Sequence, residues 1–389
     1  MSVDVSKIKK YSEVKAEILN IFSQFKVEPK GWIFIKPNLS ARPPVIRGEN
    51  TSVEFMKGLI EALLEFPAVT RIQIGHSSLL GTADKVFPFE KVVKGGGFDV
   101  LPKLYKKVEL QNLDLVDRQK VKVGNYTFDI PTFLLNHEED LYINVGALKT
   151  HMEADVSFAI KNQMGILSKE DRIQCHRSGY LQDMVAHIGL TVKADFNFID
   201  GLWGMEGNGP HHGEAKKMDL IMASDDIVEL DSLACHIIGL DYQRAGHVVL
   251  SQQLGLGQFA SPQLMARNSK YINPYNLADK YVKVGKNVYV WPTDGCSRCI
   301  TALNQSGKIF KSKPWLAWDF FRWMYLVDKK LHLVIGNAKD LKLNPNDKII
   351  TIGACTKKFA DAYNAPNLTR CPPTVKEAFD LIRKELKRK

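Results

Sequence analysis

The stretch WIFIKPN, residues 32–38, joins a short apolar run to the polar residues that directly follow it. Comparable runs recur along the chain, and amphipathic helical patterns lie between most of them. Runs as apolar as these are typical of strands buried on both faces, as in a parallel sheet. The sequence therefore predicts an α/β fold with a mainly parallel sheet and flanking helices. The expected strands are WIFIK (32–36), RIQIG (71–75), DLYINV (140–145), FNFID (196–200) and DLIMAS (219–224).

Two helices have recognisable starts. Thr51 and Glu54 have the spacing of a capping box, which predicts a helix over TSVEFMKGLIEALLEF (51–66). A second helix is expected after the aspartate pair at 225–226, one member of which would cap it. Asp231 would lie inside this second helix, where it needs a buried partner or a ligand if it faces inward. We expect Asp231 at most to support a site formed by other residues.

The chain of 389 residues is long enough for two domains and a connection. We predict an α/β domain over residues 1–255, with a β-hairpin excursion at about 100–130 that turns at Gly124-Asn125. Irregular, polar sequence over 256–287 predicts a connecting segment. Residues 288–389 would then form a smaller C-terminal α/β domain, which contains four of the six cysteines.

The composition, with 45% apolar and 25% charged residues, argues against a disordered, fibrous or disulfide-stapled chain. A net charge of +10 permits anionic ligands, but no nucleic-acid-binding module is recognisable, so we expect no nucleic-acid partner. No secretory leader and no long apolar stretch are visible, which predicts a cytoplasmic protein without membrane attachment. The aromatic run WLAWDFFRWMYLV (315–327) is expected to be a core helix, with a docking face as the alternative.

The last quarter of the chain carries Cys296 and Cys299 as C-x-x-C, followed by Cys355 and Cys371. A C-x-x-C loop lets two thiolates reach one metal, and the later pair can complete a set of four ligands. A zinc ribbon would normally close with a second C-x-x-C, whereas proline after Cys371 is more typical of iron–sulfur ligands. We therefore predict a 4Fe–4S cluster on these four cysteines, with structural zinc or unliganded thiols as alternatives. Cys235, in an apolar helix, is expected to be a buried core thiol.

Polar residues follow three of the expected strands. Because open α/β sheets bind ligands beyond the carboxyl ends of their strands, we expect these residues to form one rim. Converging lysines would suit an anionic substrate, and their crowding would lower a lysine pKa towards general-base use. The predicted catalytic residues are Lys149, His151 and Lys161, and the predicted substrate-binding residues on the same rim are Lys36, Asn38, His76 and Asn162.

The segment DGLWGMEGNGPHHG (200–213) is expected to be a glycine-rich loop after the strand FNFID. Its glycines would let the backbone approach a carboxylate or a phosphate closely. It matches neither the dinucleotide-binding nor the phosphate-loop pattern, and a plain turn is the alternative. The predicted substrate-binding residues here are Glu206, Gly207 and Gly209, and further candidate ligands are Asp200, His211 and His212.

Taken in order, KPN (36–38), the K-x-H and K-N-x-x-G motifs (149–165), MEGNGP (205–210) and D-x-x-x-x-D (226–231) resemble the domain of unknown function family 362. The resemblance covers roughly residues 30–250 and implies a fold and a site rather than a reaction. Many members of that family carry iron–sulfur ligands, often in a separate ferredoxin insert. The cysteine run of such an insert is missing here, so a cluster would have to use the four scattered cysteines.

His151 is followed ten positions later by Lys161. The same spacing is found in the nickel-pincer lactate racemases, where a histidine and a cofactor-tethering lysine serve the site, and the chain is distantly similar to them. The glycine-rich sequence around that pair in the racemases is replaced here by AIKNQMG (159–165). The similarity implies shared ancestry and a pocket for a small acid, and it does not support nickel.

These features lead to one functional hypothesis and two alternatives. The hypothesis is an iron–sulfur oxidoreductase that binds a small anionic substrate at the rim and exchanges electrons with a redox partner protein. One alternative is an electron-transfer or cluster-bearing partner subunit without its own reaction, which would not need the lysines of the rim. The other is a zinc-stapled racemase or lyase, which would be colourless.

Overall fold

The computed structural model describes residues 2–40, 45–80, 86–178, 180–210, 212–277, 282–292, 297–312, 314–336, 338, 341–371 and 373–387. The chain forms two compact units. The first contains residues 1–174 and 182–278, and the second contains residues 279–389 together with 175–181. Most of the segment expected to connect two domains, up to residue 278, is therefore part of the first unit.

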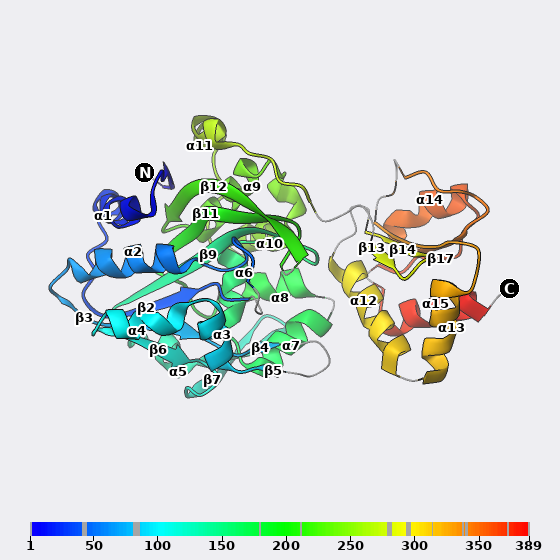
Figure 1. The fold of residues 1–389 in the computed structure, drawn as a ribbon, viewed down its shortest axis with the longest axis horizontal. Coiled ribbons are helices and arrows are strands. Elements are labelled where there is room, and N and C mark those ends of the chain that lie inside the picture. Colours follow the sequence, from blue (N-terminus) through cyan, green and yellow to red (C-terminus); the bar gives the residue numbers. More distant parts are fainter. Residues whose placement is uncertain are drawn as a thin grey trace. The chain divides into compact units, whose positions relative to one another are not determined.

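The first unit is built on an eight-stranded sheet (Figure 1). Five adjacent strands in the order β11-β9-β2-β3-β6 run parallel. On the β11 side, β12 pairs antiparallel with β11, and β1 pairs antiparallel with β12. The short strand β10 (Asp155–Ser157) pairs with β9. All five expected strands are confirmed. The bounds are β1 (Asp4–Lys7), β2 (Gly31–Pro37), β3 (Val69–His76), β6 (Val108–Asn112), β9 (Leu141–His151), β11 (Phe196–Asn208) and β12 (His212–Ser224).

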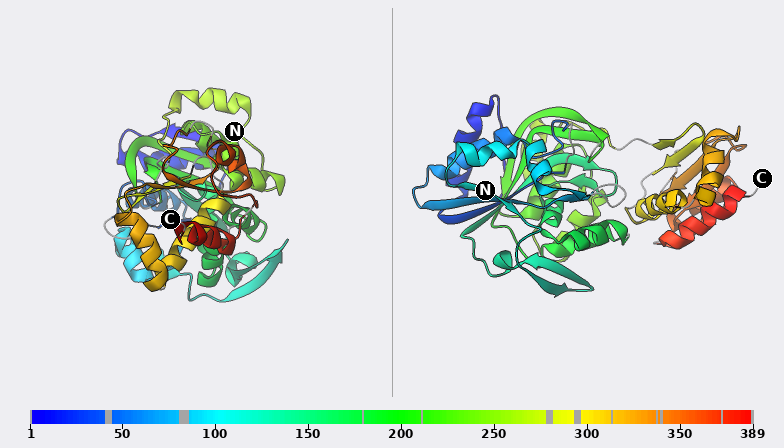
Figure 2. Two further views of the ribbon diagram at one scale, coloured as in Figure 1. Left: turned by 90° about the vertical axis from the view of Figure 1, so that its right-hand side faces the viewer. Right: turned by 60° about the horizontal axis from the view of Figure 1, so that its bottom comes forward.

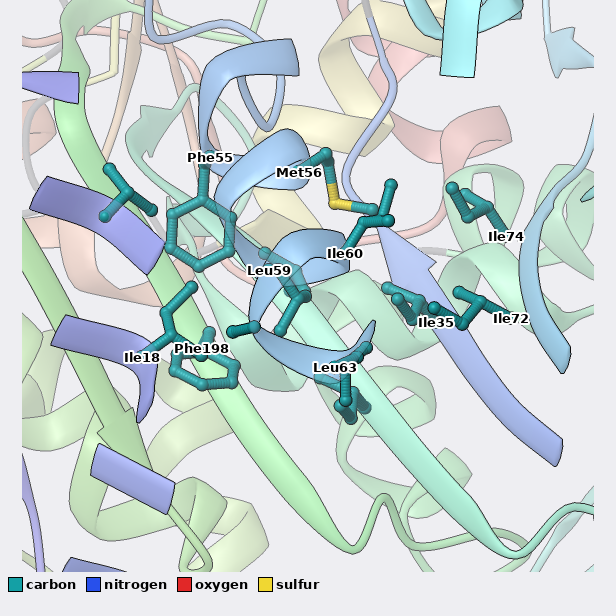
Figure 3. Packing of buried hydrophobic residues seen from close by; sticks show 14 of the residues in the cluster. Ile18, Ile35, Phe55, Met56, Leu59, Ile60, Leu63, Ile72, Ile74 and Phe198 are labelled. Carbon is teal, nitrogen blue, oxygen red and sulfur yellow. The ribbon is translucent and has the colours of Figure 1, made fainter. Parts of the chain in front are cut away.

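One face of this sheet is covered by α1 (Val14–Phe25), α2 (Val53–Leu64), α3 (Phe89–Gly95) and α4 (Leu101–Leu104). Alternate residues of the strands point to this side because side chains alternate along a strand. Figure 3 shows the apolar side of α2 lying over β2 and β3, with every labelled side chain almost fully buried. Burial of each large side chain contributes roughly 1.5–3 kcal/mol, which fixes α2 over the strands that carry the rim.

The start of α2 corrects the expected capping box. Ser52 is the N-cap, and its hydroxyl oxygen accepts a hydrogen bond from the backbone N–H of Phe55. The hydroxyl of Thr51 instead donates to the carbonyl of Val145 in β9 and accepts from the backbone N–H of Asn38. Thr51 therefore ties the segment after β2 to the middle of β9 and does not cap the helix.

The opposite face of the sheet packs against a second layer (Figure 2). Phe34 of β2 points to this side and contacts Phe133 and Tyr142. The predicted hairpin is present, because β7 (Arg118–Val123) and β8 (Tyr126–Pro131) pair in antiparallel fashion around Gly124. The remaining elements of the unit are β4 (Leu79–Leu80), β5 (Val86–Phe87), α5 (Thr132–Leu135), α6 (Ala159–Asn162), α7 (Lys169–Arg177), α8 (Leu181–Ile188), α9 (Ile227–Ile237), α10 (Gly246–Gln253) and α11 (Pro262–Asn268).

The second unit confirms a smaller C-terminal α/β fold. Its sheet has the order β13-β14-β15-β16-β17, in which β14 to β17 run parallel and β13 is antiparallel. Its core includes Phe310, Leu331, Ile350 and Phe379. The bounds are β13 (Val282–Val284), β14 (Val288–Trp291), β15 (Leu331–Ile335), β16 (Lys348–Ile352), β17 (Asn367–Leu368), α12 (Ser297–Ser312), α13 (Pro314–Tyr325), α14 (Lys357–Ala362) and α15 (Val375–Lys387).

Candidate functional site

The carboxyl ends of three neighbouring parallel strands form the candidate site. Lys36 lies near the end of β2, His76 is the last residue of β3, and Lys149 lies near the end of β9. These strands are adjacent in the order β9-β2-β3, so their ends meet at one edge of the sheet. Lys36, His76 and Lys149 are almost completely buried, with 1%, 5% and 1% of their surfaces exposed. We call these residues, together with Lys161 and Arg172, the cation cluster.

Lys161 and Asn162 are brought to this edge by the short helix α6. The two carboxylate oxygens of Asp231, in α9, accept hydrogen bonds of 2.9 Å from the backbone N–H groups of Ala159 and Ile160. Asp231 is fully buried, and burial raises its pKa to about 7. Asp231 therefore holds the first turn of α6 and thereby positions Lys161 and Asn162, which is the supporting role expected for it.

A network of side-chain amides joins these elements. The Nδ2 group of Asn162 donates to the Oδ1 atom of Asn144 at 2.8 Å and to the carbonyl of Lys36 at 3.0 Å. The Oδ1 atom of Asn162 accepts from Nδ2 of Asn38 at 3.2 Å. Asn144 in turn donates to Asn197 of β11 at 3.0 Å. The network fixes the position of α6 against the strand ends.

Lys149 has three hydrogen-bond acceptors around its ammonium group. Its ammonium group donates to Oδ1 of Asn38 at 2.9 Å, and to Oγ of Ser40 and the carbonyl of Glu49 at 2.6 Å each. Burial and the nearby charge of Lys161 together lower the pKa of Lys149 to about 7, and the charge of Glu49 opposes this shift. Lys149 therefore changes its protonation state near neutral pH.

The side chain of Lys36 is as deeply buried as that of Lys149. Its ammonium group donates to the carbonyl of Pro37 at 2.6 Å. Burial and the positive charges of Arg172 and Lys149 lower its pKa to about 7. Gly165 makes room for this side chain, because a Cβ atom there would lie 2.7 Å from Nζ of Lys36.

His76 and Arg172 complete the cluster. Burial and the charge of Lys36 hold the pKa of His76 well below its usual value, so its ring is neutral. The Nδ1 atom of His76 lies 2.6 Å from the carbonyl of Ser77. Arg172, in α7, is 5% exposed and pairs with Asp114 at 2.8 Å.

His151 and Lys161 are both buried, at 6% and 8% exposure. The Nδ1 atom of His151 accepts a hydrogen bond of 3.0 Å from the backbone N–H of Glu153, which orients the ring at the β9–β10 turn. The charge of Lys161 acts both on Lys149 and on His247, and it helps burial to lower the pKa of His247 to about 3. Lys161 therefore lies close enough to Lys149 for its charge to act on that ammonium group.

The expected glycine-rich loop is a β-hairpin, which corrects that prediction. Strand β11 continues past a bulge at Gly201/Trp203 to Asn208, and β12 begins at His212. The hairpin packs on the end of β9: Thr150 donates to the carbonyl of Gly207 at 2.8 Å, and a Cβ atom on Gly209 would lie 2.1 Å from the carbonyl oxygen of Thr150. Gly209 is thus required for close backbone approach.

The carboxylates of this segment are held by other protein groups. Glu206 accepts hydrogen bonds from Lys216 at 2.9 Å and from the backbone N–H of Asn276 at 2.8 Å. Asp200 accepts from both the backbone and the hydroxyl of Ser52, at 2.7 Å each, at the start of α2. His211 lies outside the described residues, as does the side chain of His212.

The cysteines of the second unit follow the carboxyl ends of parallel strands. Cys299 lies in the first turn of α12, which follows β14; Cys355 follows β16; and Cys371 follows β17. A Cβ atom built on Gly353 would lie 3.1 Å from Sγ of Cys299 and 3.4 Å from Sγ of Cys355, so the two sulfur atoms converge beside this glycine. Gly353 has a φ angle of +110°, which favours glycine.

These residues supply part of a metal or cluster site. Cys299 is buried, whereas Cys355 and Cys371 are exposed, and Cys296 lies outside the described residues. In the part of the chain that the structure describes, no three His, Cys, Asp or Glu side chains gather as a metal-binding group. Cys299 and Cys355 therefore fit as one pair of thiolate ligands. Cys235 is a fully buried thiol, as predicted.

Several residues in or around the cation cluster were not predicted from the sequence. Asn144 and Asn197 each interrupt an apolar strand, and a lone amide in such a run is the signal that could have identified them. Arg172 and the backbone carbonyl of Glu49 gave no comparable signal, because no sequence pattern shows that they reach the lysines of the site.

The chain is similar to known proteins. The chain is 25% identical over 248 residues to the thylakoid-associated protein sll1697 of Synechocystis sp. (strain ATCC 27184 / PCC 6803 / Kazusa), an overlap that covers 60% of this chain and 71% of that protein. Within the described ranges, every helix is too short or too polar to traverse a bilayer. The model of the domain of unknown function DUF362 matches residues 33–236, which include the cation cluster, the amide network and Asp231. The chain belongs to the DUF362 family.

Proposed function

We propose that the cation cluster binds a small anionic substrate, such as a short carboxylate, and transfers protons to or from it. The observation that carries this proposal is the burial of Lys36 and Lys149 with no carboxylate of the described residues at ion-pair distance from either ammonium group. A buried cation with no carboxylate in direct contact is costly, and a bound anion would supply such a contact.

The pKa values of Lys36 and Lys149, both about 7, define the chemistry that these side chains can perform. A lysine that is partly neutral at the working pH can accept a proton, and its protonated form can return one. The amide groups of Asn38 and Asn162 can orient a carboxylate beside them. Removal and return of a proton next to a carboxylate is the reaction that this arrangement favours.

Proton-linked anion binding tests the proposal. An anion that binds the cluster raises the pKa of both lysines, so binding near pH 8 takes up protons from the buffer. We expect calorimetric titration with a panel of short carboxylates and inorganic phosphate, in buffers of different ionisation enthalpy, to reveal at least one ligand with proton uptake. The same ligand should bind at least about tenfold more weakly to Lys36→Met and Lys149→Met variants. Binding that is unchanged in both variants would refute the proposal.

We further propose that Cys296, Cys299, Cys355 and Cys371 hold a 4Fe–4S cluster, which would make the protein an iron–sulfur oxidoreductase with a separate redox partner. Support comes from the position of these residues after parallel strands and from the convergence of Cys299 and Cys355 on Gly353. Such a cluster would supply electrons when bound. Anaerobic purification with iron and sulfide assays tests this: brown protein that loses its colour in Cys299→Ser supports the cluster, and colourless protein with stoichiometric zinc refutes it.

We also propose a cytoplasmic location for this chain. The lack of a spanning helix in the described ranges supports it. The name of the Synechocystis relative associates that protein with thylakoids. Fractionation of cells that express this chain would distinguish the two locations.

A further inference from the structure

Helix α13 of the second unit exposes a row of large apolar side chains. Five residues on one side of the helix and at its end are 42–65% exposed, which is unusual for side chains of this size. The exposed fractions are 65% for Trp315, 57% for Trp318, 42% for Phe321, 50% for Tyr325 and 59% for Leu326. We call these five residues the aromatic stripe.

The other side of α13 is firmly packed. Leu316 and Trp323 are only 6% and 5% exposed and belong to the core of the unit. The indole N–H of Trp323 donates to the carbonyl of Leu386 in α15 at 3.1 Å. Phe320 stacks on Phe310 of α12. The expectation that this helix lies in the core is therefore correct for one side only, and the stripe is presented outward by a helix that is fixed in place.

The stripe lies in a strongly basic unit. Residues 279–389 carry 22 lysines and arginines against 10 aspartates and glutamates, a net charge of +12. Residues 1–278 carry 31 against 33, a net charge of −2, so the whole positive excess belongs to the second unit. Exposed lysines occur on α12, after α13 and on α15, the helices that contact each other here. They are Lys308, Lys329, Lys330, Lys384 and Lys387.

We propose that the aromatic stripe binds the surface of an anionic lipid bilayer. Tryptophan, tyrosine and phenylalanine are the side chains best suited to the boundary between headgroups and acyl chains, and neighbouring lysines attract anionic headgroups. Such binding needs no spanning helix. It is also independent of the anion site in the first unit.

Two other occupants fit the surface less well. A second copy would bring another unit of charge +12 to the same place, and this repulsion opposes association. Single-stranded nucleic acid needs aromatic faces open for stacking. Here Trp318 and Phe321 stack on each other at 5.9 Å between ring centres, and Phe321 contacts Tyr325 at 5.1 Å, so part of each face is already covered.

Vesicle co-sedimentation of the full chain tests the proposal. Vesicles of phosphatidylcholine alone are compared with vesicles that also contain phosphatidylglycerol, at low and at high salt. We expect binding to the anionic vesicles that weakens at high salt. The variant Trp318→Ser/Phe321→Ser/Tyr325→Ser should lose at least about tenfold in partitioning, because three inserted rings are removed while Leu316 and Trp323 still anchor the helix.

A matched control replaces exposed apolar side chains of the first unit by serine. Leu104→Ser/Leu115→Ser alters side chains that are 56% and 80% exposed and should leave vesicle binding unchanged. Circular dichroism verifies that each variant is folded. Equal partitioning of the triple variant and the native chain, or absence of binding to anionic vesicles, would overturn the proposal. Light scattering that shows a dimer lost in the triple variant, or competition by oligothymidylate that depends on the stripe, would also overturn it in favour of a protein or nucleic-acid partner.

Discussion

The ammonium group of Lys149 donates a 2.9 Å hydrogen bond to the side-chain oxygen of Asn38, although 111 positions separate the two residues in the sequence. This bond joins the end of β9 to the segment after β2. It uses a neutral acceptor, so it orients Lys149 without neutralising its charge. The site thus keeps a positive charge available for a ligand.

The pH dependence of stability should reveal the two buried lysines. Both pKa values fall from 10.5 to about 7 on folding, so between these pH values the unfolded chain holds protons that the folded chain has released. The free energy of unfolding should therefore rise with pH from about 7 to 10.5, by at most about 1.4 kcal/mol per pH unit for each lysine. Lys149→Met should reduce this slope in urea unfolding, whereas Lys91→Met, on an exposed position of α3, should leave it unchanged.

Asp231→Asn should weaken anion binding indirectly, through the position of α6. An asparagine side chain has one acceptor oxygen, so one of the two N–H groups at the start of α6 loses its partner. We expect a cost of about 1–3 kcal/mol in the free energy of unfolding and a weaker anion affinity, since Lys161 and Asn162 lose their support. Asp226→Ala removes the N-cap of α9 itself. It should lower stability by about 1 kcal/mol and leave anion affinity intact; equal anion affinity in both variants would contradict the positioning role of Asp231.

Gly209→Ala should disturb the hairpin over the site. Its new Cβ atom would collide with the backbone of Thr150, next to His151. We expect a loss of stability of several kcal/mol or a displaced hairpin, measured by thermal unfolding and by anion titration. Gly255→Ala, at a φ angle of +77° with no atom within 4 Å of the added carbon, should cost only about 1 kcal/mol. Comparable costs for the two variants would show that the close approach at Gly209 is unimportant.

Gly353→Ala should impair metal binding by the second unit if Cys299 and Cys355 share one centre. The added carbon would lie against both sulfur atoms. We expect the iron or zinc content per chain to fall at least by half. Gly285→Ala is the control, because it has a φ angle of +67° in the same unit and lies against Met324 instead of a cysteine. Retention of full metal content in Gly353→Ala would show that Cys299 and Cys355 do not share one metal centre.

Lys161→Ala distinguishes an enzyme from an electron carrier. An enzyme that uses the cation cluster should lose anion binding or turnover in this variant, while its metal content stays constant. An electron carrier should keep its reduction and reoxidation rates, because the rim plays no part in electron transfer. Stopped-flow measurements of both rates, with iron content measured on the same samples, decide between the two.

Much of the first unit could be predicted from sequence because its strands contain apolar runs that are followed by polar residues. This pattern located β2, β3 and β9, and the ends of these strands meet because parallel neighbours share an edge. The pattern could not locate Arg172, whose approach depends on how α7 folds back towards Asp114. It also misplaced the cap of α2, since Thr51 and Ser52 are both good caps and only the tertiary contact of Thr51 with Val145 decides between them.

The glycine-rich segment shows a second limit of sequence patterns. Glycines usually end strands, yet β11 runs through Gly204 and Gly207 because pairing with β12 supplies its hydrogen bonds. Likewise, the apolar composition of α13 predicts a buried helix, and only its packing reveals that one aromatic side is buried and the other is exposed. Spacing alone could place Cys299 and Cys355 in one unit, but it could not show that their sulfur atoms both lie beside Gly353.

The pairing of β1 with β12 also affects how the protein is made. Asp4 lies opposite Ala223, so in a growing chain residues 4–7 have no partner strand until more than two hundred further residues have been synthesised. Until then the segment remains available to chaperones and proteases. A bulky fusion placed directly before residue 4 would interfere with this late step and leave the outer edge of β12 open to aggregation.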